Sequence, residues 1–163
     1  MLIPISLLWA WMMAAQGPAA ATATVVSAGE LDATLKQAIA SSTVDTMVKT
    51  TAIQGGNATV AVLHREKAET SALIHDHVTE IYQITEGSGT LTTGGTLQDP
   101  KENDLTRLGA GMSHTGTHVG GSSRHVGPKD VIIVPAGMAH RFSQLDGPIS
   151  YLVYRFEPAA AKK

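Results

Sequence analysis

Eight short runs rich in β-branched residues follow one another between residues 44 and 156, many of them separated by turns that contain glycine. These runs are residues 44–50, 58–64, 72–77, 80–85, 89–93, 131–134, 141–144 and 149–156. Many short strands at close intervals are typical of a β-sandwich or a β-barrel. The last run alternates apolar residues on both faces, so we expect it to be a central or covered strand. The sequence therefore predicts an all-β domain over residues 45–156.

A short helix is predicted before the first strand. Ser27 and Glu30 have the spacing of a capping box, and Leu31, Leu35 and Ile39 then repeat at helical intervals. We expect a helix over residues 28–40, within an N-terminal extension of residues 24–44. Residues 157–163 are expected to form a C-terminal tail.

The charge balance and the absence of cysteine exclude several classes of function. The chain has 163 residues, with 12 basic and 14 acidic side chains, so there is no positive field to attract nucleic acid. Zero cysteines exclude disulfides, a cysteine nucleophile, thiolate zinc sites and iron–sulfur clusters. A metal would therefore have to be bound by carboxylates and by some of the seven histidines.

The first 23 residues are predicted to be a cleaved signal peptide. An apolar run at residues 2–15 is too short to span a membrane comfortably, and Ala21-Thr22-Ala23 fits a signal-peptidase site. The run has no preceding Lys or Arg, which leaves an uncleaved amphipathic or membrane-anchoring start as the alternative. We expect export to a periplasm or to the outside, with no stable membrane span after the signal is removed.

The strongest chemical signal is a group of histidines and a carboxylate. His75, His77 and Glu80 lie close together, and His140 follows about sixty residues later. Residues two apart in a strand point to the same face, so His75 and His77 could address one point inside a barrel. Imidazoles with a carboxylate suit iron, manganese, nickel, copper or zinc, and three or four protein ligands leave positions for water, oxygen or substrate.

At these residues the sequence resembles the cupin superfamily. His75, His77, Glu80 and the six-residue gap to Gly87 match much of its first motif, G-x5-H-x-H-x3 or x4-E-x6-G. The resemblance implies a double-stranded β-helix, or jelly-roll, barrel over residues 45–156 with a metal in its mouth. It ranks His75, Glu80 and His140 first as metal ligands and His77 slightly below them.

The first motif departs from the family pattern in one gap. Only two residues separate His77 from Glu80, so either a bulge at residues 78–79 shifts the inward face or one ligand is lost. If Glu80 is kept, a four-residue gap makes His75 the second histidine of the motif and leaves Leu73 at the first. His77 is then the doubtful ligand.

The second motif, G-x5-P-x-G-x2-H-x3-N, is matched by Pro135, Gly137 and His140. Lys129 stands at its first glycine, although Gly127 lies close enough to make a turn. Gln144 replaces the closing asparagine, which is not usually a ligand.

Other residues near the predicted site have two interpretations each. Tyr82 shares the face of Glu80 and could donate a hydrogen bond or a proton to a substrate, or could simply pack in the wall. Residues 109–127 carry six glycines and are expected to form a long, mobile loop or hairpin. His114, His118 and His125 in this stretch are either acid–base groups on a lid or exposed loop residues.

These features favour a metal-dependent enzyme that acts on a small, oxygen-rich organic molecule. The resemblance leaves dioxygenase-like, isomerase and lyase chemistry open, with iron or manganese favoured over nickel, zinc and copper. The alternative is a non-catalytic module that binds a small ligand or a metal. A third hypothesis is an interaction protein without a metal, and the apolar strand at residues 149–156 would suit a homodimer.

Overall fold

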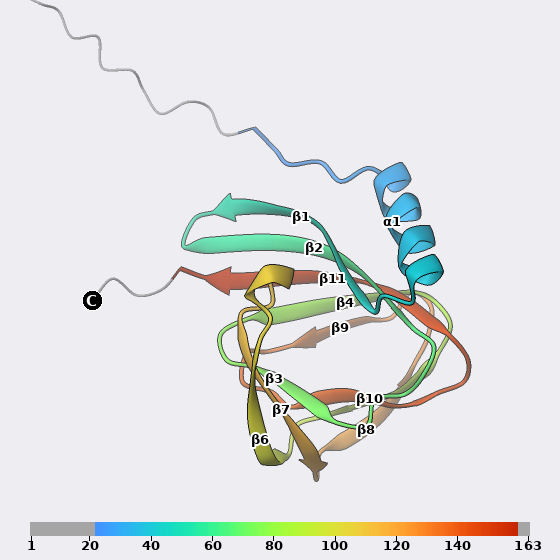
Figure 1. Ribbon diagram of the computed structural model, residues 1–163, viewed down its shortest axis with the longest axis vertical. Helices are drawn as coiled ribbons and strands as arrows, with labels where there is room; N and C mark the ends of the chain where they lie inside the picture. Colours follow the sequence, from blue (N-terminus) through green and yellow to red (C-terminus); the bar gives the residue numbers. More distant parts are fainter. Residues whose placement is uncertain (1–21, 160–163) are drawn as a thin grey trace, which may run out of the picture.

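The computed structural model describes residues 22–159, which form two facing antiparallel sheets and an N-terminal helix (Figure 1). The first sheet has the strand order β1-β2-β11-β4-β9. Its strands are β1 (Asp45–Ile53), β2 (Gly56–Arg65), β11 (Ile149–Pro158), β4 (Thr79–Glu86) and β9 (Val131–Val134). The second sheet has the order β6-β7-β3-β10-β5-β8. Its strands are β6 (Thr96–Asp104), β7 (Met112–Val119), β3 (Ala72–His75), β10 (His140–Leu145), β5 (Gly89–Thr93) and β8 (Ser122–Val126).

The predicted all-β fold with a short N-terminal helix is confirmed. Helix α1 (Ala28–Ser41) begins after the capping box, in which the Ser27 hydroxyl accepts from Glu30 N and the Glu30 carboxylate accepts from Ser27 N. Leu31 and Leu35 line a hollow with Val62 and Leu152, so the helix covers part of the outer face of the first sheet. Figure 1 shows it at one end of β1 and β2.

Strand β11 lies at the centre of the first sheet, as its apolar sequence predicts. It pairs with β2 on one side and with β4 on the other. Ile149, Tyr151 and Val153 are at most 1% exposed and point between the sheets. On the opposite face Phe156 is 39% exposed, so only the inner face of this strand is fully covered.

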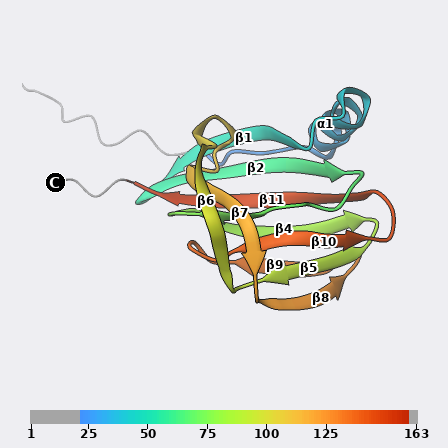
Figure 2. The ribbon, with the colours of Figure 1, turned by 60° about the horizontal axis from the view of Figure 1, so that its bottom comes forward.

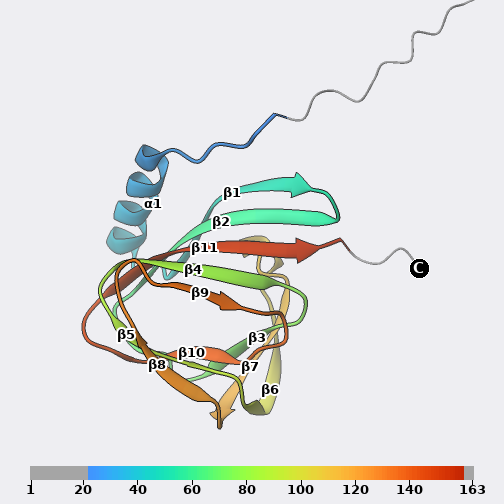
Figure 3. The same ribbon diagram turned by 180° about the vertical axis from the view of Figure 1, so that it is seen from behind.

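The space between the sheets is filled by apolar side chains. Figure 3 shows the two sheets from behind, with β4 and β9 in one and β8 and β10 in the other. The buried apolar cluster between them consists of Ala61, Leu63, Tyr82, Ile84, Leu91, Val126, Val134, Phe142, Ile149, Tyr151 and Val153. This cluster leaves the metal candidates at one end of the barrel.

The glycine-rich stretch at residues 109–127 forms one arm of a long bent hairpin. Residues 89–104 pair with residues 112–126, from Gly89 opposite Val126 to Asp104 opposite Met112. At the bend between β5 and β6 and between β7 and β8, four glycines have φ between 73° and 93°: Gly94, Gly95, Gly120 and Gly121. The hairpin alternative is therefore the observed one. The sequence did not predict strands β6, β7 and β8, because their residues are mostly polar and glycine interrupts their pattern.

The bend turns β6 and β7 across one end of the barrel, as Figure 2 shows. The tip of this hairpin, residues 105–111, contains the short helical turn η1 (Thr106–Leu108). Strands β3 and β10 occupy the space between β7 and β5 in the second sheet. This arrangement brings β3, β10 and the hairpin tip to the same end of the barrel.

The predicted signal peptide stays a prediction. Most of the predicted signal peptide, residues 1–21, lies outside the described residues. Among the described residues, no helix is long and apolar enough to span a bilayer.

Candidate metal centre

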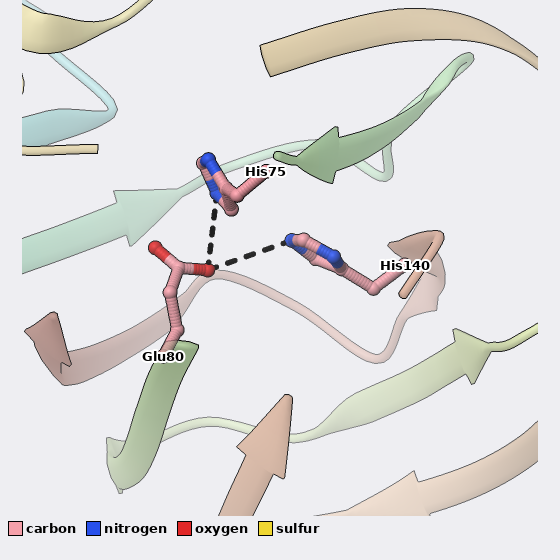
Figure 4. A group of neighbouring side chains, drawn as sticks. All are labelled: His75, Glu80 and His140. Carbon is pink, nitrogen blue, oxygen red and sulfur yellow. Dashed lines mark ion pairs between the residues drawn. The ribbon is translucent and has the colours of Figure 1, made fainter. Parts of the chain in front are cut away.

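His75, Glu80 and His140 converge between the two sheets, as Figure 4 shows. His75 is the last residue of β3, Glu80 the second of β4 and His140 the first of β10. The Nε2 atoms of His75 and His140 lie 3.3 and 3.5 Å from the same oxygen, Glu80 Oε2. The three residues are 3%, 2% and 5% exposed, respectively.

The spacing of these three donor atoms suits a single divalent metal ion. Metal–nitrogen and metal–oxygen bonds of about 2.0–2.2 Å place neighbouring ligand atoms about 2.8–3.6 Å apart. The two distances to Glu80 Oε2 fall in this interval, and all three donor atoms lie within 4.8 Å of one another. The group could therefore hold a metal with little movement of the side chains.

Both imidazoles are oriented by their other ring nitrogen. His75 Nδ1 lies 2.9 Å from the carbonyl oxygen of Ala110, and His140 Nδ1 lies 3.0 Å from that of Met138. A carbonyl can only accept, so each Nδ1 carries a proton, and each Nε2 is directed at the centre and is the nitrogen that can bind a metal. Ser113 Oγ, 2.8 Å from His75 Nδ1, adds a second polar contact to this ring.

Glu80 is held as an anion. Burial alone would raise the pKa of its carboxyl group, but His75, Arg155 and His140 outweigh burial and hold that pKa well below its ordinary value. The pKa of His140 is lowered, chiefly by burial and against the attraction of Glu80. An ionised carboxylate beside a neutral imidazole is the protonation state that metal binding requires.

Arg155 was not predicted as a site residue. It is 2% exposed, and its Nε donates to Glu80 Oε1 at 2.8 Å. In the sequence it follows Ile149, Tyr151 and Val153 at the same two-residue interval. A charged residue that continues the apolar face of a central strand needs a buried partner, and this signal could have identified it.

Tyr82 lies against the carboxylate. As predicted, it shares the buried face of β4 with Glu80 and Ile84. Its hydroxyl donates to Glu80 Oε2 at 2.7 Å, and its ring packs 5.1 Å from that of Tyr151. Burial and the charge of Glu80 raise the pKa of Tyr82 well above its usual value, so the hydroxyl stays a donor at neutral pH.

His77 lies apart from the other three residues and is exposed. The expected alternation of His75 and His77 in one strand does not occur, because β3 ends at His75 and the chain turns before β4 begins at Thr79. In this turn Val78 is buried, at 1% exposure. The pairing of His75 with Glu80 in the candidate group corresponds to the alternative with a four-residue gap.

The residues of the second motif support the centre through backbone contacts. Gly137, at φ 78°, donates its N–H to the carbonyl oxygen of His75 at 2.8 Å. The Pro135–Gly137 turn thus fixes the end of β3 next to the start of β10. Lys129, which replaces the motif glycine, has φ 77° and keeps the left-handed conformation that glycine favours.

The three histidines of the hairpin are held in strands β7 and β8 rather than on a lid. His114 Nδ1 lies 2.9 Å from Asp76 Oδ1, and His125 Nε2 lies 2.7 Å from Asp146 Oδ2. His118 Nε2 lies 2.7 Å from the carbonyl oxygen of Gly94, at the bend. Within residues 22–159, none of the three belongs to the candidate metal group.

No protein-family model matches the chain, and no curated protein matches its sequence. Three solved structures follow a similar chain course. A protein from Bacillus halodurans is 18% identical, with a TM-score of 0.42 over 63% of this chain and 64% of its own. A cupin superfamily protein from Desulfitobacterium hafniense is 14% identical, with a TM-score of 0.42 over 70% and 76%. Hydroquinone 1,2-dioxygenase from Sphingomonas is 15% identical, with a TM-score of 0.44 over 63% and 60%.

The chain spans less than two-thirds of the length of the first and the third of these structures. The second of the three is named as a cupin superfamily protein. These likenesses describe the course of the backbone. The candidate site rests on the geometry of His75, Glu80 and His140.

Proposed function

We propose that His75, Glu80 and His140 bind one divalent metal ion and that the chain is a metal-dependent enzyme. The observation that carries the proposal is the convergence of three buried donor atoms from three strands, with both imidazoles at 3.3–3.5 Å from one carboxylate oxygen. The ionised carboxylate of Glu80 is kept out of water, which costs several kcal/mol unless a cation compensates its charge. Arg155 supplies one positive charge, which it shares with Asp45.

The donor set favours iron or manganese. Two imidazoles and one carboxylate with open positions are the ligand set of mononuclear non-haem iron oxygenases. A bound ion of this kind would polarise a substrate oxygen or take part in redox chemistry with dioxygen. We propose a small, oxygen-rich organic substrate, with dioxygenase-like, isomerase and lyase reactions as the classes to be tested.

The residues of the chain have separate roles in this proposal. The carbonyls of Ala110 and Met138 fix the tautomer and the direction of the two imidazoles. Tyr82 donates to Glu80 Oε2 and limits the motion of the carboxylate. The apolar cluster between the sheets excludes water from the inner side of the centre.

A second candidate function is a non-catalytic metal site that stabilises the barrel. The specific observation in its favour is burial, because none of the three side chains is more than 5% exposed. A substrate would reach them only after the barrel end opens. A metal that stays enclosed would instead add its binding energy to folding.

The experiment that tests both functions uses the purified mature protein. Its metal content is measured first, and it is then loaded with Fe²⁺ or Mn²⁺ and offered diketones, phenols, flavonols and sugar acids. Oxygen consumption or a change of substrate mass, lost in His140→Ala, would support the enzyme. Stoichiometric metal with no reaction on any class would support the stabilising site. No metal binding at all would refute both.

A further inference from the structure

We propose that Arg155 is a positioning residue that reserves one oxygen of Glu80, so that the carboxylate presents only Oε2 to a metal ion. This inference rests on the proposed metal site and concerns how that site is built. It assigns a role to a residue that lies outside the ligand group.

Arg155 and Glu80 are direct cross-strand partners. They face each other in the pairing of β11 with β4, and both side chains are 2% exposed. The Nε of Arg155 donates to Glu80 Oε1 at 2.8 Å. The other carboxylate oxygen, Oε2, faces the two imidazoles and accepts from Tyr82. The two oxygens of Glu80 therefore have separate partners.

The guanidinium group has no freedom to leave Glu80. Its Nη1 donates to the carbonyl oxygen of Leu108 at 2.8 Å and to Asp45 Oδ1 at 3.2 Å, and its Nη2 donates to Asp45 Oδ2. Asp45 lies on β1, Leu108 in the hairpin tip and Glu80 on β4, so three segments hold the guanidinium group in one orientation. A rotation that released Glu80 Oε1 would break several buried charge-assisted hydrogen bonds.

This arrangement limits how Glu80 can bind a metal. A carboxylate that binds through both oxygens would have to take Oε1 away from Arg155. With Arg155 in place, the protein contributes three bonds, two from imidazoles and one from Oε2. The remaining positions stay open to water, oxygen or substrate.

A purely structural role for Arg155 predicts something different. If Arg155 only neutralises buried acids and anchors the hairpin tip, then removing Asp45 or Arg155 should affect stability without changing the metal's coordination. Asp45→Asn is a matched control, since it alters the same guanidinium on the side away from Glu80. Arg155→Lys is a second control, because its ammonium group can still donate to one carboxylate oxygen.

The test uses Co²⁺ as the probe, since its visible spectrum responds to the identity and the arrangement of its ligands. The full chain and the variants Arg155→Met, Arg155→Lys and Asp45→Asn are loaded with Co²⁺, with folding checked by circular dichroism. We expect Arg155→Met to have a visible spectrum that differs from that of the wild type, because Glu80 Oε1 becomes free to bind the metal. The wild-type band should be retained in Arg155→Lys and in Asp45→Asn.

Two results would overturn the inference: a wild-type spectrum in folded Arg155→Met, or an equal spectral change in Asp45→Asn. A crystal structure of the wild-type protein with Co²⁺ provides a test that needs no variant. There we expect Oε2 alone within bonding distance, and two bonded oxygens would refute the proposal. If wild-type protein binds no Co²⁺, Fe²⁺ or Mn²⁺, the proposed metal site itself fails, which is a separate outcome.

Discussion

Each imidazole of the candidate centre is prepared for metal binding by a backbone contact. The carbonyls of Met138 and Ala110 hold the protons on Nδ1 of His140 and His75, so that the Nε2 atoms face Glu80. Orienting contacts of this kind usually contribute about 10–100-fold to metal affinity. The two imidazoles therefore need little reorientation when a metal binds.

Replacing His140 by Ala removes one of three donors, and we expect Fe²⁺ or Mn²⁺ affinity to fall by more than about 100-fold, beyond the usual effect of an orienting contact. Isothermal titration calorimetry measures this change. His77→Ala is the matched control, because His77 is exposed and lies apart from the group. An equal loss of affinity in His77→Ala, or none in His140→Ala, would contradict this assignment.

Lys129 is strained by its backbone conformation, at φ 77°. A residue with a Cβ costs about 1–2 kcal/mol in the left-handed region. Glycine avoids this cost, but its more flexible unfolded state offsets part of the gain in stability. We expect Lys129→Gly to stabilise the protein by about 0.5–1 kcal/mol, measured as a higher urea midpoint with an unchanged slope. Lys129→Ala keeps the strain and should show no such gain. A lower midpoint in Lys129→Gly would show that the lysine side chain stabilises the turn.

The bent hairpin depends on two pairs of glycines that lie side by side at its corner. Gly95 approaches the carbonyl oxygen of Val119, where an added Cβ would lie 2.3 Å away. Gly94 has a similar φ, 78° against 73°, but an added Cβ there would meet nothing within 4 Å. The two positions thus separate the cost of backbone strain from the cost of a steric clash.

We expect Gly94→Ala to destabilise the protein by about 0.5–1 kcal/mol, because the less flexible unfolded chain offsets part of the cost of the left-handed backbone. Gly95→Ala should cost more, by about another 1–3 kcal/mol, since the strands must move apart at the corner. Urea unfolding of the two variants provides the comparison. Equal losses would mean that the corner can relax around a methyl group.

In the whole molecule, metal binding and folding are linked because the ligands come from β3, β4 and β10. β4 belongs to the first sheet and β3 and β10 to the second, so the three donors meet only in the folded chain. A ligand that binds only the native state stabilises it by about 2.7 kcal/mol at 100 times its dissociation constant. The metal should therefore act on the stability of the entire barrel.

Chelation of a metal-loaded sample should lower Tm by about 5–10 °C, given about 2–4 °C per kcal/mol for a chain of this size. Differential scanning calorimetry with and without EDTA measures the shift. The His140→Ala variant should melt at the same temperature in both conditions. A wild-type Tm that does not respond to metal or to EDTA would argue against a bound ion.

Much of the fold could be predicted because strands with β-branched residues and a capped helix leave local patterns. The central position of β11 and the start of α1 follow from alternation and from the Ser27–Glu30 capping box. Strands β6, β7 and β8 could not be predicted in this way. Their polar residues pair because the tip at residues 105–111 turns the chain back on itself, and this pairing leaves no alternation of apolar residues in the sequence.

In the candidate site, too, some residues could be predicted from the sequence and others could not. The amino-acid sequence alone determined that any metal must be bound by histidine and carboxylate, and its motifs ranked His75, Glu80 and His140 first, with His77 slightly below them. Only the tertiary structure placed His77 apart from the group and Arg155 beside Glu80, because both outcomes depend on where strands end and which strands become neighbours. Residue type is local information, whereas the meeting of donor atoms depends on the packing of two sheets.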